Sequence, residues 1–165
     1  AADSVATTDD SHWHLNGAFT PLYSVAQDET TLRNDKPTTC ISADADENVS
    51  QMETYNAVNR NPKEYLGHRV RVSVMLKSDG IRICTPYIAV RGNGDRMLNK
   101  NGGENRSGPP GFLKGMWSLY TVEADVPKDA GNISTGICLT GRGKLWMDDF
   151  KIEIIDDAAS AATTP

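Results

Sequence analysis

Residues 143–155 read GKLWMDDFKIEII, and this stretch decides the fold. Apolar and polar side chains alternate on both sides of the acidic pair Asp148-Asp149, but the phase shifts by one residue across that pair. Alternation with a period of two predicts a β-strand with one buried face, and the shift predicts a bulge at the two aspartates. Adjacent carboxylates repel each other and need solvent, a cation or hydrogen-bond donors. The stretch therefore predicts a late strand with an unusual acidic position.

The length, hydrophobic pattern and net charge of the chain indicate one ordinary globular domain. A chain of 165 residues can bury a sizeable core. No apolar run in the sequence approaches the roughly 18 residues that span a bilayer, so we expect no membrane segment. The formal net charge is −5, and Lys and Arg cluster only at residues 67–71, which argues against a nucleic-acid partner. The sequence leaves the oligomeric state and the compartment, whether secreted, periplasmic or cytoplasmic, open.

Three cysteines, Cys40, Cys84 and Cys138, are widely spaced and lack the C-x-x-C pattern of zinc and redox sites. Each lies in an apolar, strand-like context, where buried free thiols are common. We interpret them as small core residues. One disulfide with one free thiol stays an alternative.

The chain divides into a folded unit and two tails. Residues 1–10 and 156–165 are rich in Ala, Thr, Ser and Asp and lack apolar periodicity, so we expect mobile tails around a single domain at 11–155. Residues 91–115 contain many glycines and predict a long loop, with a short strand near Met97 as an option. Alternating segments predict separate strands at 12–15, 23–28, 37–43, 51–58, 69–77, 81–90, 117–126, 133–140 and 143–155. Many short strands with almost no helical pattern indicate an all-β, antiparallel sandwich or barrel.

Several stretches resemble jelly-roll domains of the galactose-binding-like superfamily: YLGHRVRVS at 65–73, KSDG at 77–80, WSLY at 117–120, DVP at 125–127 and GRGKLWMDDF at 141–150. Bacterial stand-alone domains labelled as relatives of AraC-type transcription regulators are similar, as are xylan- and glucan-binding carbohydrate modules. The resemblance covers residues 11–155 and implies an antiparallel two-sheet β-sandwich whose concave sheet carries aromatic sugar platforms. It also implies a structural Ca²⁺ near the first and last strands. The sequence shows no DNA-binding helix-turn-helix, so the regulator label is not carried over.

The acidic pair is a candidate calcium site, because Ca²⁺ takes about six to eight oxygen ligands. We expect Asp148 or Asp149 to contribute a carboxylate, together with Asp28 and with backbone carbonyls around Asn34 to Lys36. The alternative is a solvated bulge, or a carboxylate held by an arginine or by backbone N–H groups.

Aromatic residues are the candidate ligand contacts, because their rings stack on sugars and their polar atoms bind hydroxyls. Trp117 opens a strand beside the glycine-rich loop, three tyrosines are amphipathic, and one acid is a weaker candidate. The set is Tyr55, Tyr87, Trp117, Tyr120 and Glu53. Packing within the sheets is the alternative for each aromatic ring.

The sequence is compatible with three functions. The leading hypothesis is a non-catalytic module that binds a carbohydrate or similar polar ligand on the concave sheet. The alternative is a small stand-alone cyclase, isomerase or lyase with an apolar substrate in the mouth of the sandwich, and a protein-interaction domain is the third. The sequence lacks G-x-S-x-G, P-loop and dinucleotide-binding motifs. An enclosed apolar cavity with a perturbed carboxylate would favour the enzyme.

Overall fold

The computed structural model describes residues 13–17, 22–43, 53–102 and 115–155. The tails expected at 1–10 and 156–165 lie outside these residues. Within the described ranges no helix is long and apolar enough to cross a membrane. The strands are β1 (His14–Asn16), β2 (Tyr23–Arg33), β3 (Lys36–Ala43), β4 (Glu53–Asn59), β5 (Arg69–Arg91), β6 (Met97–Gly102), β7 (Ser118–Asp125) and β8 (Asn132–Ile154). The helices are the single 3-10 turns η4 (Lys63–Tyr65) and η5 (Asn93–Asp95).

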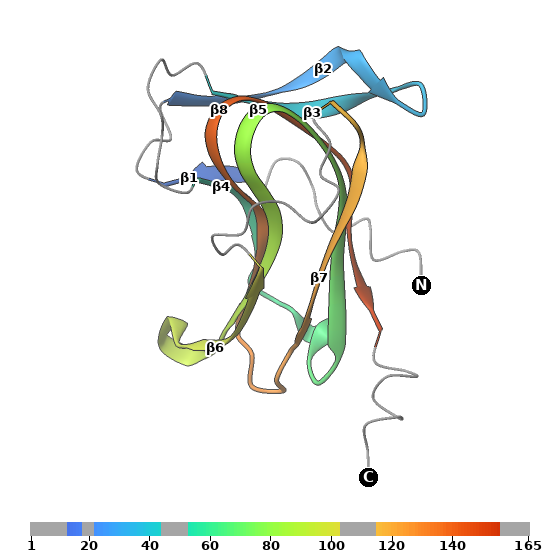
Figure 1. Ribbon diagram of the computed structural model, residues 1–165. Helices are drawn as coiled ribbons and strands as arrows, with labels where there is room; N and C mark the ends of the chain where they lie inside the picture. The colour runs from blue at the N-terminus through green and yellow to red at the C-terminus, as the bar shows by residue number, and fades with distance from the viewer. Residues whose placement is uncertain (1–12, 18–21, 44–52, 103–114, 156–165) are drawn as a thin grey trace.

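Two long strands, β5 and β8, pair antiparallel along almost their whole length and pass through both layers of the molecule (Figure 1). The second half of β5 and the first half of β8 form sheet I, with the order β6–β5–β8–β4–β1. Their other halves form sheet II, with the order β7–β5–β8–β3–β2. The two sheets face each other, which confirms the predicted two-sheet jelly roll.

The sequence predicts separate strands on either side of residues 78–80 and of residues 141–142, whereas the structure joins each pair into one bent strand. Gly80 and Gly143 have φ angles of 88° and 129°, which side chains rarely allow. Because both strands bend at the same level, Asp79 still pairs with Lys144 and Ile81 with Gly141. The pairing of β5 with β8 therefore continues from one sheet into the other, with shifts of register at the bend.

The hydrophobic core fills the space between the two sheets. Val70, Val72, Val74 and Leu76 alternate along the first half of β5 and are each 0% exposed, as the period-two pattern predicts. The opposite side of the core comes from sheet I, through Ile88, Val90, Ile133, Ile137 and Leu139. Burial of each such side chain stabilises the fold by about 1.5 to 3 kcal/mol at most.

The acidic pair forms the predicted bulge. Met75 pairs with Asp148 but Ser73 pairs with Lys151, so β8 uses one more residue than β5 across this step. Asp149 takes the left-handed conformation, with a φ of 56°. The extra residue resets the phase, and Phe150 and Ile152 return to the core.

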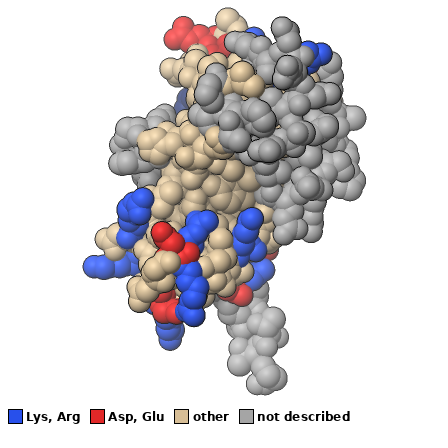
Figure 2. Space-filling view, turned by 90° about the vertical axis from the view of Figure 1, so that its left-hand side faces the viewer, with Lys and Arg blue, Asp and Glu red and all other residues tan. Residues whose placement is uncertain are grey.

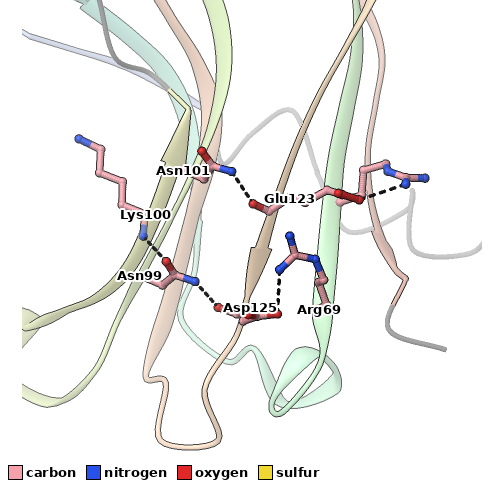
Figure 3. Close-up of polar contacts among 7 residues, drawn as sticks. Arg69, Asn99, Lys100, Asn101, Glu123 and Asp125 are labelled. Atoms are coloured by element: carbon pink, nitrogen blue, oxygen red, sulfur yellow. Dashed lines mark hydrogen bonds and ion pairs between the residues drawn. The ribbon is translucent and has the colours of Figure 1, made fainter. Parts of the chain in front are cut away.

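The free edges of the two sheets are joined by amide side chains on β6 (Figure 3). Asn99 donates from Nδ2 to the carbonyl of Asp125 at 2.9 Å, and Asn101 donates to the carbonyl of Glu123 at 2.7 Å. Their own Oδ1 atoms accept the backbone N–H groups of Lys100 and Gly102. Sheet I is thereby hydrogen-bonded to β7 of sheet II.

All three cysteines are buried and free, which confirms them as small core-type residues. Burial raises the pKa of Cys84 and of Cys138 to about 12, so both thiols stay neutral.

Replacement of Gly143 by alanine should destabilise the fold by about 3 kcal/mol or more. The new Cβ would lie 2.1 Å from the carbonyl oxygen of Asp79, and the paired backbone of β5 and β8 cannot separate cheaply. Gly94→Ala is the control, because Gly94 also has a positive φ of 68° but has no atom within 4 Å of that position. It should cost only about 1 to 2 kcal/mol. Urea unfolding measures the free energy of unfolding of both variants. Equal destabilisation by the two substitutions would contradict a steric clash between a Cβ at residue 143 and the carbonyl of Asp79.

Candidate functional site

The structure does not bring the five predicted ligand residues together. Tyr87 points away from the core on sheet I, whereas Tyr55 points from the same sheet toward the core side. Tyr120 packs within the core, and Trp117 is half-buried directly before β7. Glu53 begins β4, and its side chain lies outside the described part of the structure. A site with all five residues therefore has no common surface, and their ligand roles stay predictions.

Sheet I has a second face that points away from the core, and we call it the outer face of sheet I. It lies on the left in Figure 1 and faces the viewer in Figure 2. The register of the strands defines its members, because alternate residues share a face. They include His14, Asn16, Thr54, Asn56, Val58, Thr85, Tyr87, Ala89, Arg91, Lys100, Gly102, Asn132, Ser134, Gly136 and Cys138.

Four of these side chains form a hydrogen-bonded row across four strands, which we call the polar row: Asn16, Asn56, Ser134 and Tyr87. Asn16 donates from Nδ2 to Oδ1 of Asn56. Asn56 donates to Oγ of Ser134 at 3.1 Å, and that oxygen lies 3.0 Å from the hydroxyl of Tyr87. A buried polar group is tolerated when such partners satisfy it, and the row is also held rigid by them.

The centre of the outer face carries small side chains. Gly136 lies between Asn56 and Tyr87 in the register, so no side chain separates these two residues. A Cβ at Gly136 would lie 2.2 Å from the carbonyl of Tyr55 and 2.6 Å from the Cα of Asn56. Ala89 and Cys138 extend the same small surface beside Tyr87. The polar row therefore crosses a part of the outer face that carries only small side chains, and we call this part the floor.

The groups on this face stay neutral where they are buried. Burial raises the pKa of Tyr87, although the bond to Ser134 and the charge of Arg91 act in the opposite direction. The hydroxyl of Tyr87 thus remains protonated and can donate or accept. Asn56 keeps one further amide N–H beyond its bond to Ser134. The row can therefore offer both donors and acceptors to a polar ligand.

Sequence reasoning missed Asn16, Asn56 and Ser134, although a signal for Ser134 was present. Ile133 and Ile137 mark the core phase of the strand, and residues 134, 136 and 138 take the opposite phase. Small and polar residues on a strand between two other strands indicate a second face with its own role.

A separate cavity of about 470 Å³ lies beside the β8 bulge, and we call it the bulge cleft. Its aromatic wall is formed by Trp13 with Tyr55, whose ring centroids lie 5.0 Å apart, and by Phe150. Asp148 and Asp149 also line it. The remaining lining residues come from β2, β3 and β8 and are Val25, Ala26, Gln27, Pro37, Thr38, Thr39 and Met147. The acidic pair thus lies beside the early strands, as the sequence suggests.

The predicted calcium ligands already have protein partners, except one. Asp28 accepts three hydrogen bonds from Thr30 and Thr31 through Oδ1, and one from Nε1 of Trp146 through Oδ2. Asp148 forms an ion pair with Arg33 at 3.0 Å. An arginine therefore holds this carboxylate, as the alternative to a cation expected. Asp149 lines the cleft and has no partner for its carboxylate among the residues that the structure describes, and Lys36 is exposed at the start of β3. Among the described residues no group of three or more His, Cys, Asp or Glu side chains could hold a metal. These side chains alone do not form a metal site, so a Ca²⁺ here would depend on backbone carbonyls and water for most of its ligands, and the cation stays a prediction.

Comparison with known proteins supports the fold. No family model matches the sequence. The chain is 26% identical over 151 residues to an uncharacterized HTH-type transcriptional regulator, YbfP, of Bacillus subtilis (strain 168). The matched region spans 88% of this chain but only 48% of the regulator, about half its length.

Three solved structures are similar to this chain in fold, and the carbohydrate-binding modules among them are β-sandwich jelly rolls. The enzymatically active domain of tailspike protein 4 of bacteriophage CBA120 has a TM-score of 0.68 at 13% identity, over 89% of this chain and 20% of that one. The CBM22-1 xylan-binding domain of Paenibacillus barcinonensis Xyn10C has a TM-score of 0.64 at 9% identity, over 92% and 91%. The CBM22-1-GH10 modules of Clostridium thermocellum Xyn10B, complexed with xylohexaose, have a TM-score of 0.62 at 15% identity, over 91% and 27%. At these identities the likeness establishes the fold.

Asp28 should make stability depend on pH in the acid range. The hydrogen bond from the Thr30 hydroxyl, then that from Trp146, holds the pKa of Asp28 well below its ordinary value of 3.8. The stabilisation is therefore complete above that ordinary value and is lost as the pH falls toward the folded-state pKa. Asp28→Asn should lower the melting temperature at neutral pH and flatten its fall below pH ~4. Asp129→Asn, an exposed site, should leave the profile unchanged. A wild-type profile from Asp28→Asn would contradict this role.

A structural Ca²⁺ in the bulge cleft predicts that a chelator lowers the melting temperature, because the ion would bind only the folded form. Asp149→Asn should remove that response, since Asp149 is the predicted ligand whose carboxylate has no partner among the described residues. Differential scanning calorimetry with and without the chelator measures the shift. An unchanged melting temperature would count against the cation.

Proposed function

We propose that this chain is a non-catalytic module that binds a carbohydrate or similar polar ligand on the outer face of sheet I, the candidate for the concave binding sheet. The polar row is the single observation that carries the proposal. It sets Asn56, Ser134 and Tyr87 in fixed orientations on one face. Fixed polar groups on strands bind with little loss of conformational entropy.

The chemistry of the face suits sugar hydroxyl groups, which both donate and accept hydrogen bonds. Tyr87 and Ser134 carry hydroxyls, and Asn56 carries an amide, so each can contact a sugar hydroxyl in either sense. The exposed side chain of Val58 on the same face offers contact to the C–H groups of a sugar ring.

The structural relatives support the class of ligand. One of them is a xylan-binding domain, and another was solved with xylohexaose. Because both share the jelly roll with this chain, a carbohydrate is the ligand class that we test first.

Two other functions lead to different expectations. Similarity to half of an HTH-type regulator favours a small polar effector on the same face, as the second candidate function. The enzyme alternative needs an apolar cavity and a carboxylate with a raised pKa. The bulge cleft instead contains Gln27, Thr39 and Asp149, and the clearly shifted carboxylate among the described residues, Asp28, has a lowered pKa. These features favour binding over catalysis.

A glycan array followed by titration calorimetry tests the proposal. The wild-type chain should bind one class of oligosaccharide, with xylohexaose among the probes, and Ser134→Ala should weaken that binding about tenfold. The reason is that Ser134 joins Asn56 to Tyr87 and its loss frees both groups.

Ser73→Ala is the matched control. Ser73 is also a buried serine, but it lies on sheet II and its hydroxyl has no hydrogen-bond partner among the described residues. This variant should bind like the wild type. Absence of any glycan hit, with tight binding of an apolar metabolite instead, would overturn the proposed function.

A further inference from the structure

Two positively charged side chains stand on the outer face of sheet I in a chain whose net charge is −5. Arg91 continues the alternation of Tyr87 and Ala89 along β5, and Lys100 pairs directly with Ala89 from β6. Neither forms an ion pair with any residue that the structure describes. In Figure 2, Lys and Arg side chains gather over the lower part of the view, with Asp and Glu side chains among them.

The two cations lower the pKa of groups in the polar row and beside it. The charge of Arg91 lowers the pKa of Tyr87, and the charge of Lys100 lowers the pKa of Cys138, each against the larger effect of burial. Such effects require charges close to the hydroxyl and the thiol. Arg91 and Lys100 therefore border the surface that the polar row crosses.

The acidic residues near this end of sheet I are engaged elsewhere. Asp95 accepts a hydrogen bond from Asn132 at 3.5 Å, and Asp129 lies 3.8 Å from Arg96. Neither carboxylate forms an ion pair with Arg91 or Lys100, so within the described part of the chain both cations are free to contact a ligand.

We propose that the ligand of this face carries an anionic group, as a uronic acid residue of a carbohydrate does. The inference rests on the carbohydrate-binding function proposed above and specifies its ligand class. The planar guanidinium of Arg91 can hold a carboxylate through two parallel N–H bonds, and the ammonium of Lys100 adds a flexible point charge. The neutral polar row then contacts the hydroxyls of the same sugar.

Arg91 and Lys100 also offset, at this face, the negative charge of the whole chain. A net charge of −5 repels an acidic polymer at long range, and local cations offset that repulsion at the site. Binding of the anionic ligand should therefore weaken as salt concentration rises, because the attraction at an exposed rim is screened.

Two matched probe pairs test the ligand class by calorimetry. One pair is xylohexaose and a xylo-oligosaccharide of equal length with one glucuronic acid branch. The other is an oligogalacturonide and its methyl ester, which share the sugar backbone and differ in the charge and the methyl group of each carboxyl. We expect the charged member of at least one pair to bind about tenfold or more tightly, a typical value for a charge-assisted hydrogen bond. Acetate and inorganic phosphate, as free anions, should not compete at equal concentration.

Substitutions at Lys100 locate the effect. Lys100→Gln should lower the ratio of the affinities for the charged and the neutral probe about tenfold. Lys100→Arg should leave that ratio unchanged. Lys63→Gln is the control, because it removes the same charge from the exposed surface of η4, outside this face. Circular dichroism checks that each variant is folded.

The outcomes separate the two proposals. Equal binding of neutral and charged probes would overturn the anionic ligand and leave the carbohydrate function intact. Equal effects of Lys100→Gln and Lys63→Gln, or competition by acetate as strong as by the oligosaccharide, would overturn it as well. If no oligosaccharide of either kind binds, the carbohydrate function fails and the anionic sugar falls with it.

Discussion

The antiparallel pairing of β5 with β8 is the interaction on which the rest of the structure depends. Each strand supplies part of both sheets, so one ladder sets the distance between the sheets, the packing of the core and the position of the bulge. A slip of one residue in this ladder would turn Val72 outward and Ser134 inward. The alternation of large apolar residues along both strands excludes that slip, because it would expose the core.

The candidate binding surface follows from the same alternation that builds the core. Ile133 and Ile137 bury one phase of β8, and Ser134 and Gly136 necessarily occupy the other phase. The outer face is therefore carried by strands that are fixed on both sides by neighbours, rather than by loops. A surface of this kind is organised before a ligand arrives, which favours recognition through a few oriented polar groups.

The sequence could predict the strands, the bulge and the buried thiols because each depends on local pattern, whereas the jelly roll was implied by the resemblance to known domains. The polar row depends on register instead, since Asn56 and Ser134 are 78 residues apart and Tyr87 and Ser134 are 47 apart. Tyrosine alone does not reveal its face, and this is why Tyr55, Tyr87 and Tyr120 divide between the core side and the outer face. The sequence singled out Asp28 but not its hydrogen bond with Trp146, because the two residues are 118 positions apart.

The amides of Asn99 and Asn101 have an effect on how copies of this molecule meet. An exposed strand border offers carbonyl groups that can recruit a strand from a neighbouring molecule and begin aggregation. On β7 the carbonyls of Glu123 and Asp125 are already occupied by side chains of the same chain. A foreign strand would have to displace them, so two asparagines help to keep the molecule from polymerising along this border.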